Sequence, residues 1–578
     1  MRTCFFCLAM CLLWACEDSD FANAVPGGRQ PDSTVAIEPD AATIADAATQ
    51  SDARIADASV PDAAVPDAGA PVQQRWWHDD VFYEIFVRSF QDSDGDGVGD
   101  INGLISRLDA LNDGDPSTDT DLGITGLWLM PIHPSPSYHG YDVTDYRGIN
   151  PDYGTMADFE RLLDEAHARG ISVVIDLVVN HSSAQHPWFI DARTGEEAEH
   201  RDWYVWRRTD PRWQAPFGLG PTLWHGAPGG WLYYGVFWSG MPDLNHRNEA
   251  VYAEMLDTAR EWLDRGVDGF RFDAVRYLIE TEDGELADID ETHDWFKRLR
   301  ADLDATHPEA LLLAEAWSNT EKVAAYYGDD DELHLAFNFD LSQAIQQATI
   351  TGDASGLRFT LDSARRTFAT RRFEAPFITN HDMNRLMRDN RVGVPEFKVA
   401  MALLMGLPGT PFLYYGEEIG MEGGPLEADE DKRTPMRWTP DDPHFGFTDG
   451  TPWRSRSEDE GVDVATQRDD PTSLWSHTRD LIALRSSDLL WSLGDTMRLD
   501  TPSKGVVALM RTYEGRRGIV AVNFDRTDID VPIEIELPAP AEGLLVQAFS
   551  PDASVRLDGD RLIINGLGAL GWIYLQLQ

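Results

Sequence analysis

The chain has 578 residues, of which 42% are hydrophobic and 25% charged, and its formal net charge is −51 at pH 7. This length exceeds one ordinary domain, so two or three globular units are expected. The strong negative charge argues against nucleic acid and anionic membrane surfaces as partners and favours an uncharged substrate.

All four cysteines lie near the start of the chain, at positions 4, 7, 11 and 16, so the rest has no disulfide and no cysteine nucleophile. Residues 1–16 combine one basic residue, a short apolar run and a final Ala15-Cys16, which is typical of an export signal. Residues 13–16 (LWAC) resemble the bacterial lipobox, in which the cysteine is lipidated and becomes the mature N-terminus. Cleavage after Ala24 is the alternative. Acidic residues separate that position from the apolar run, which favours lipidation of Cys16.

The next segment, residues 17–75, repeats alanine, aspartate and proline in loose succession. Small and acidic residues cannot bury enough apolar surface to offset the conformational entropy of the chain. We therefore predict a disordered linker, with folded structure beginning near Trp76 and Trp77.

From residue 81 to residue 416, apolar strand-like runs alternate with helical patterns such as 158–169 and 251–265. Near-continuous apolar strands connected by helices indicate a parallel sheet buried on both faces. Eight such strands fit a (β/α)8 TIM barrel, an α/β fold. The predicted strands are 81–90, 124–131, 171–180, 267–275, 310–317, 333–339, 373–379 and 410–416.

Two stretches depart from this alternation. A long segment dense in aromatic residues follows the third strand, so we predict an inserted B domain at 182–247. Short alternating apolar stretches after residue 495 predict a C-terminal antiparallel β-sandwich domain at 495–578. The barrel is accordingly expected in two parts, 76–181 and 248–494.

Acidic side chains stand at the predicted C-terminal ends of barrel strands, which converge on one pocket. Arg271 and Asp273 share one strand face, and the arginine keeps the aspartate ionised, as a nucleophile must be. Glu315 ends a run of apolar residues, so desolvation raises its pKa toward that of a general acid. Two carboxyl groups about 5 Å apart are what retaining glycoside hydrolysis requires.

Two further strands end in a similar way, one with His381 and Asp382 and one with Asp176 and His181. A single carboxylate at a strand end is more often a helix cap or a solvated residue. Four such ends, in order on a barrel pattern, indicate an active site instead.

The chain resembles the α-amylase family, the family 13 glycoside hydrolases, across residues 76–578. The motifs that carry the resemblance are GITGLWLMPI, YHGYDVTDY, DLVVNH, MPDLN, GFRFDAVRY, LLLAEAW, FITNHD and GTPFLYYGEEIGM, in family order. MPDLN is similar to the intermediate group of the family that includes lipoprotein α-amylases. The resemblance implies a nucleophile, an acid/base and a third carboxylate that clamps sugar hydroxyls: Asp273, Glu315 and Asp382. It also implies a set of substrate-binding residues: Tyr141, which stacks beneath the sugar, His139, His181, Arg271 and His381.

We therefore expect an α-amylase that cleaves α-1,4-glucosidic bonds in starch and maltooligosaccharides with retention. An α-glucosidase, a neopullulanase or a transglycosylase of the same family remain alternatives. A non-catalytic glucan-binding surface protein is disfavoured, because all three carboxylates are present. Ala274 follows the nucleophile where relatives with α-1,6 preference tend to have valine, which favours α-1,4 linkages.

The expected partner is a neutral α-glucan, with no nucleic acid. Membrane contact is expected only through the N-terminal lipid anchor, which makes the protein an exported cell-surface or outer-membrane lipoprotein. A secreted extracellular protein is the alternative, and a monomer is expected in either case.

Residues 92–100 (DSDGDGVGD) place aspartates at alternate positions with glycine between them. Carboxylates at positions one, three and five and a backbone carbonyl at position seven match a calcium loop. We predict one structural Ca²⁺, with these ligands: Asp92, Asp94, Asp96, the carbonyl of Val98, and Asp100. A solvated acidic turn is the alternative, and no catalytic metal is expected.

A second calcium site of the family, at Asn180, is expected to be compromised. The resemblance implies an aspartate and a histidine as its other ligands, and Asn245 and Tyr277 stand at those positions. The replacement removes one charge and one ligand.

Overall fold

The computed structural model describes residues 74–578 except 217–221, 369–373, 426–427, 441–443, 455–460, 528–531 and 550–552. The predicted export signal, the lipidation of Cys16 and nearly all of the predicted linker lie outside the described residues. Residues 74–578 form one compact unit. Within the described part of the chain, no helix is both long enough and apolar enough to cross a membrane.

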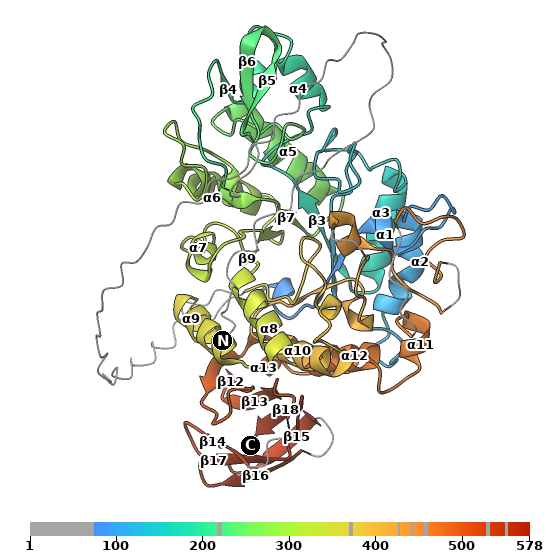
Figure 1. Ribbon diagram of the computed structural model, residues 1–578, viewed down its shortest axis with the longest axis vertical. Helices are drawn as coiled ribbons and strands as arrows, with labels where there is room; N and C mark the ends of the chain where they lie inside the picture. The colour runs from blue at the N-terminus through green and yellow to red at the C-terminus, as the bar shows by residue number, and fades with distance from the viewer. Residues whose placement is uncertain are drawn as a thin grey trace, which may run out of the picture. The chain divides into compact units, whose positions relative to one another are not determined.

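A parallel sheet forms the centre of this unit (Figure 1). Its strand order is β10-β1-β2-β3-β7-β8-β9. Parallel bridges from Phe337 to Ala375 and from Phe377 to Phe412 join the two edges of the sheet and close the barrel. The strands are β1 (Phe82–Ile85), β2 (Gly126–Leu129), β3 (Ser172–Leu177), β7 (Gly269–Phe272), β8 (Leu311–Ala314), β9 (Leu335–Ala336) and β10 (Phe412–Tyr414).

The structure confirms the predicted (β/α)8 barrel, with two corrections to the strands. Residues 373–379 form no regular strand among those described, and only the bridges at Ala375 and Phe377 mark the eighth position. The predicted strand 81–90 ends at Ile85, and its last four residues form helix α1 instead, because their apolar side chains pack on the core as a helical turn.

The helices follow the strands in alternation (Figure 1). Thr155 begins one of the predicted helices, α3, with a capping box to Asp158, and Asn248 caps the first turn of α5. The helices are α1 (Val87–Phe90), α2 (Ile101–Leu111), α3 (Met156–Ala168), α4 (Pro187–Ala192), α5 (Glu249–Asp264), α6 (Asp290–Asp304), α7 (Thr320–Ala325), α8 (Phe339–Thr351), α9 (Ser355–Thr367), α10 (Val394–Gly406), α11 (Val464–Arg468), α12 (Leu474–Ser486) and α13 (Leu489–Leu493).

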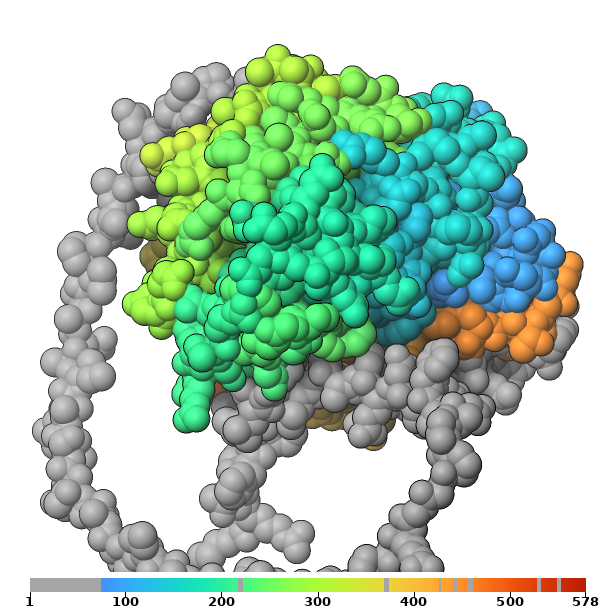
Figure 2. Space-filling model, turned by 90° about the horizontal axis from the view of Figure 1, so that it is seen from above, coloured from blue at the N-terminus to red at the C-terminus, as the bar shows by residue number. Residues whose placement is uncertain are grey.

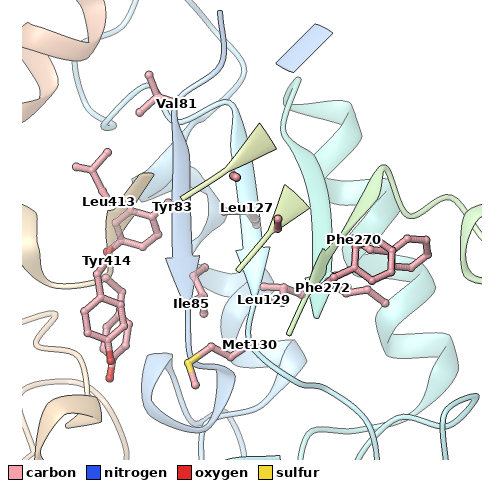
Figure 3. Close-up of a cluster of buried hydrophobic side chains, with 14 of the residues drawn as sticks. Val81, Tyr83, Ile85, Leu127, Leu129, Met130, Phe270, Phe272, Leu413 and Tyr414 are labelled. Atoms are coloured by element: carbon pink, nitrogen blue, oxygen red, sulfur yellow. The ribbon is translucent and has the colours of Figure 1, made fainter. Parts of the chain in front are cut away.

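Side chains on each barrel strand alternate between the interior and the surrounding helices. Phe272 points outward and its ring lies 5.8 Å from that of Phe296 on α6. Trp128 points inward and its ring lies 5.2 Å from that of Phe337, on the other side of the barrel, so the interior is filled. Figure 3 shows part of the outer cluster: Val81, Tyr83, Ile85, Leu127, Leu129, Phe270, Phe272 and Leu413.

An insertion follows β3 and precedes α5. It contains α4 and a three-stranded sheet in the order β4-β6-β5, formed by β4 (Trp206–Arg207), β5 (Trp224–Ala227) and β6 (Trp231–Tyr234). Isolated bridges from His181 to Asp243 and from Tyr204 to Leu244 join the start of the insertion to its end. In the space-filling view the insertion, in green, lies over the upper face of the unit (Figure 2).

Two antiparallel sheets form the C-terminal end of the chain, as predicted. The first has the order β11-β12-β13-β18-β15 and the second β14-β17-β16, with one apolar core drawn from both. The strands are β11 (Asp495–Leu499), β12 (Val506–Tyr513), β13 (Arg516–Asn523), β14 (Ile533–Glu536), β15 (Leu544–Phe549), β16 (Ser554–Asp558), β17 (Arg561–Asn565) and β18 (Trp572–Leu577).

Hydrogen bonds connect these sheets to the last turn of α10. Arg511 on β12 donates to the carbonyl of Gly406 at 2.7 Å, and the hydroxyl of Tyr574 on β18 donates to the carbonyl of Ala402 at 2.6 Å. Arg485 on α12 donates to the carbonyls of Met405 and Leu407 at 2.8 and 2.9 Å. The last four carbonyls of a helix have no partner within it, so Arg511 and Arg485 complete the end of α10, and Tyr574 bonds one turn earlier.

Candidate active site

Arg271, on the inner face of β7, is fully buried and contacts three carboxylates. Its Nη1 donates to Asp176 Oδ1 at 2.6 Å and to Asp273 Oδ1 at 2.7 Å, and its Nη2 lies 3.1 Å from Glu315 Oε2. The three carboxylates stand at the C-terminal ends of the adjacent strands β3, β7 and β8. One guanidinium therefore holds both carboxylates predicted to perform the chemistry.

The backbone after Asp273 turns into the left-handed region. Ala274 has φ 52° and ψ 36°, a strained conformation for a residue with a side chain. This turn directs the Ala274 N–H to Glu315 Oε2, which accepts it at 2.9 Å. The side chains of Asp273 and Glu315 remain 14% and 11% exposed, so a substrate can reach them.

Glu315 has the raised pKa that its place after an apolar strand predicts. Burial, together with the nearby charges of Asp273 and Asp382, raises its pKa to about 7 against the opposing effect of Arg271. A large fraction of this carboxyl group is therefore protonated near neutral pH, as a proton donor must be.

Asp382 has the opposite surroundings. Arg433 Nη2 donates to its Oδ1 at 2.9 Å, and His381 Nε2 lies 3.1 Å from its Oδ2. Burial would raise the pKa of Asp382, but His381 and Arg433 outweigh burial and hold the pKa well below its usual range. Asp382 therefore stays ionised.

Arg433 was missed by the sequence analysis. It lies in the 3-10 helix η7 (Asp429–Arg433), outside the barrel strands. The segment Asp-Glu-Asp-Lys-Arg looks like any solvated charged loop, so no periodic pattern distinguishes Arg433 from a surface residue. The structure shows that the side chain is fully buried.

His381 lies inside the barrel between three polar partners. Its Nδ1 is 2.5 Å from Glu84 Oε1, and its Nε2 is 2.8 Å from the hydroxyl of Tyr141. The rings of Tyr141 and His381 stack, with centroids 5.7 Å apart. Burial lowers the pKa of His381, but Asp382 and Glu84 overcome this effect and raise it to about 9.

Glu84 was also missed, although the sequence holds a signal for it. It lies on β1 between Tyr83 and Ile85, which both belong to the outer cluster. Strand alternation therefore places the carboxylate in the barrel interior, where a charged residue requires a partner.

The two remaining predicted histidines are neutral. Burial lowers the pKa of His139 to about 3 and that of His181 to about 4. Tyr141 N donates to His139 Nδ1 at 3.1 Å, and the charge of Asp273 acts on His181. His181 Nε2 is buried without a hydrogen-bond partner among the described residues. The structure thus brings all eight predicted catalytic and substrate-binding residues into one site.

The catalytic-domain model of the α-amylase family (Alpha amylase, catalytic domain) matches residues 84–492. This chain belongs to the α-amylase family. It is an enzyme, a glycoside hydrolase, in agreement with the resemblance drawn from its motifs.

Several members of the family are similar over most of their length. The chain is 38% identical to alpha-amylase 3 of Dictyoglomus thermophilum, covering 78% of this chain and 86% of that protein. It is 36% identical to the trehalose synthase/amylase TreS of Mycolicibacterium smegmatis, covering 78% and 82%. The solved structure of the alpha-amylase from H. orenii superposes with a TM-score of 0.77 at 36% identity, covering 86% of this chain and 99% of that one. These relatives differ in activity.

The acidic loop before α2 gathers three of its four aspartates. Carboxylate oxygens of Asp92, Asp94 and Asp100 lie within 4.8 Å of one another, and Asp96 is outside this group. Asp92 Oδ1 accepts from the N–H of Gly95 at 2.8 Å, and Asp96 Oδ1 accepts from Val98 N at 2.8 Å. Clustered carboxylate oxygens form a donor set that fits a hard cation such as Ca²⁺.

A second acidic cluster lies where the insertion meets the barrel. Asn180 Nδ2 donates to Asp243 Oδ2 at 3.2 Å, and Asn180 Oδ1 is buried without a hydrogen-bond partner among the described residues. Burial raises the pKa of Asp243 well above its usual value, and the charge of Glu280 adds to the effect. The sequence analysis counted Asn245, whose side chain bonds instead to the carbonyl of Asp202, and missed these two acids.

Proposed function

We propose that this glycoside hydrolase is an α-amylase that cleaves α-1,4-glucosidic bonds in starch and maltooligosaccharides with retention of configuration. The observation that carries the proposal is the shared hold of Arg271 on Asp273 and Glu315. Two carboxyl groups on one guanidinium fit the close pair of a retaining enzyme, about 5 Å apart, better than the wider pair that leaves room for a water.

In the first step, a carboxylate oxygen of Asp273 attacks the anomeric carbon. The glycosidic bond breaks as Glu315 transfers its proton to the departing oxygen, and a glycosyl ester forms on Asp273. Arg271 holds the carboxylate of Asp273 in place through a hydrogen bond of 2.7 Å. Because the pKa of Glu315 is raised to about 7, a large fraction of this carboxyl group carries a proton near neutral pH and can donate it.

In the second step, the Glu315 carboxylate accepts a proton from water, whose oxygen attacks the anomeric carbon. The ester bond to Asp273 breaks, and the product carries the same α configuration as the substrate. Asp382 is held ionised by His381 and Arg433, so it accepts hydrogen bonds from sugar hydroxyls and stabilises the positive charge that develops on the sugar.

The α-1,4 linkage is supported by Ala274 after the nucleophile, and the α-amylase identity by the similarity to alpha-amylase 3. The MPDLN motif is consistent with the intermediate group of the family. The chain is also 36% identical to a trehalose synthase/amylase, so transglycosylation is the second candidate function. An α-glucosidase or a neopullulanase would use the same carboxylates.

Product analysis tests this proposal. The purified enzyme is incubated with soluble starch, pullulan and maltotriose, and the first product anomers are read by proton NMR. We expect α anomers from starch, released faster than any product from pullulan. Initial β anomers would overturn the retaining mechanism, whereas isomerisation of maltose to trehalose would favour the second candidate.

A structural Ca²⁺ in the 92–100 loop is the second part of the proposal. Asp92, Asp94 and Asp100 would hold it, since their carboxylate oxygens already converge. The ion would neutralise the loop and fix it at the start of α2, without a part in the chemical steps.

The third part concerns location, on the basis of residues 13–16 alone. Lipidation of Cys16 would anchor the enzyme at the cell surface, since a bacterial lipoprotein carries more than one acyl chain. The wild type is then expected in the membrane fraction, with Cys16→Ala releasing it. Wild-type protein found mainly in the culture supernatant would count against the anchor.

A further inference from the structure

Glu84 contacts the site from inside the barrel, below the residues that face the sugar. It lies on β1, its side chain is 2% exposed, and its Oε1 is 2.5 Å from His381 Nδ1. The same oxygen is 3.4 Å from the backbone N–H of His381. Glu84 therefore binds the histidine on the side opposite to Asp382.

The other ring nitrogen of His381 faces a second carboxylate. Nε2 lies 3.1 Å from Asp382 Oδ2 and 2.8 Å from the hydroxyl of Tyr141. A neutral ring with its proton on Nδ1 would turn a lone pair of Nε2 toward a carboxylate oxygen, which is repulsive. A ring protonated on both nitrogens donates from Nδ1 to Glu84, and its Nε2–H lies between the Tyr141 hydroxyl and the Asp382 carboxylate, which its positive charge attracts.

We propose that Glu84 is a positioning residue that keeps His381 protonated on both ring nitrogens, so that the imidazolium fixes the orientation of Asp382 toward the bound sugar. The proposal rests on the proposed function only for the role of Asp382. It assigns to β1 a part in the site that the strand-end motifs do not reveal.

The charges around the ring support this state. Three carboxylates, Glu84, Asp176 and Asp382, favour the imidazolium, and two arginines oppose it. Arg433 donates from Nε to the backbone carbonyl of His381 at 3.1 Å, and Arg271 donates to Asp176 at 2.6 Å. Among the described residues, the titratable and charged groups around His381 are Glu84 from β1, Tyr141 from the loop after β2, Asp176 from β3, Arg271 from β7, Arg433 from η7, and Asp382.

Glu84→Gln tests the proposal, because glutamine keeps the size and the hydrogen bonding of the side chain and removes its charge. We expect kcat/KM on maltotriose to fall about tenfold to a hundredfold, as when a carboxylate that orients a working histidine is removed. The loss is expected mainly in kcat, because the clamp on the distorted sugar strengthens in the transition state.

Nitrogen NMR of histidine-labelled enzyme supplies a readout that a merely structural role would not move. At neutral pH the wild-type His381 is expected to carry a proton on both ring nitrogens, and Glu84→Gln only one. Glu374→Gln is the matched control. Glu374 is a buried barrel glutamate that accepts from Asn338 at 2.5 Å, and among the described residues its side chain has no hydrogen bond to a site residue. Its activity and His381 signals are expected to match the wild type.

Three outcomes would overturn the proposal: wild-type kcat/KM in Glu84→Gln, a doubly protonated His381 in that variant, or a singly protonated His381 in the wild type at neutral pH. The last measurement needs no variant, so it decides the question if Glu84→Gln does not fold. Failure of the wild type to hydrolyse α-glucans would refute the proposed function alone, because the His381 signals are read without substrate.

Discussion

The two halves of the active site share charge in opposite ways. Around Arg271, one cation serves three carboxylates, and the pKa of Glu315 is raised to about 7. Asp382 instead contacts two cations, His381 and Arg433, which also pair with Glu84 and Asp429, and its pKa is held well below the usual range. The number of cations in direct contact with each carboxylate thus separates a carboxyl group with a raised pKa from a permanent anion within one pocket.

The largest expected effect comes from the half with excess carboxylate. Asp273→Asn removes the proposed nucleophile and keeps the shape of the side chain, so turnover should fall by about 10⁴-fold or more. Arg271 retains Asp176 and Glu315 as partners, and the melting temperature should change little. Initial rates on maltotriose and thermal melts check both statements, and residual activity above about a tenth of the wild type would reject Asp273 as nucleophile.

The next effect belongs to the half around Asp382. Arg433→Met leaves His381 as the remaining cation in direct contact with the carboxylate of Asp382 among the described residues. We expect kcat to fall about a hundredfold, as when one preorganised donor is removed from a charged centre. Lys432→Met is the matched control, because Lys432 donates to the backbone carbonyl of Asp382 and not to its carboxylate. A loss in Lys432→Met as large as in Arg433→Met would show that net charge matters more than the direct contact.

The pH dependence of kcat/KM tests whether the charge in one half of the site acts on the other half. As the proposed proton donor, Glu315 can act only below its pKa, so kcat/KM should fall as the pH rises through about 7. The negative charge of Asp382 contributes to that raised pKa, so Asp382→Asn should shift the alkaline limb to lower pH, on top of a large loss of rate. If the alkaline limb of kcat/KM stays in place or moves to higher pH in Asp382→Asn, the charge of Asp382 does not raise the pKa of Glu315.

The smallest effect lies outside the pocket. If the proposed Ca²⁺ binds the 92–100 loop, EDTA should lower the melting temperature by a few degrees, because the repulsion among the loop's carboxylates is no longer offset. The rate at low temperature should stay unchanged. Asp94→Asn should abolish most of this response, and an undiminished response in that variant would assign cation binding to the cluster at Asn180 and Asp243 instead.

Sequence reasoning located the parts of the site that stand on regular strands. Asp273, Glu315 and their barrel were predictable, because strand alternation and apolar runs fix where a strand ends and which side chains face inward. Residues 373–379 were predicted as a strand, and the structure reduces them to isolated bridges. The same strand alternation predicts that Glu84 on β1 points into the barrel, but the sequence analysis overlooked it.

The parts supplied by loops could not be predicted in the same way. Arg433 reaches Asp382 from a short charged segment far along the chain, and nothing local marks its burial. Asp243 and Glu280 lie 37 positions apart and meet only because the insertion folds back on β3. Contacts of this kind depend on tertiary packing, which composition and periodicity do not encode.

The end of α10 has a consequence for how the enzyme can be shortened or recombined. Arg511 and Tyr574, from the C-terminal sheets, are bonded to carbonyls of that helix, which belongs to the barrel. Cutting the chain before β11 would expose those carbonyls and the apolar surface around them. The sheets are therefore not an interchangeable accessory, and a swap between relatives must carry the helix end together with its arginine and tyrosine.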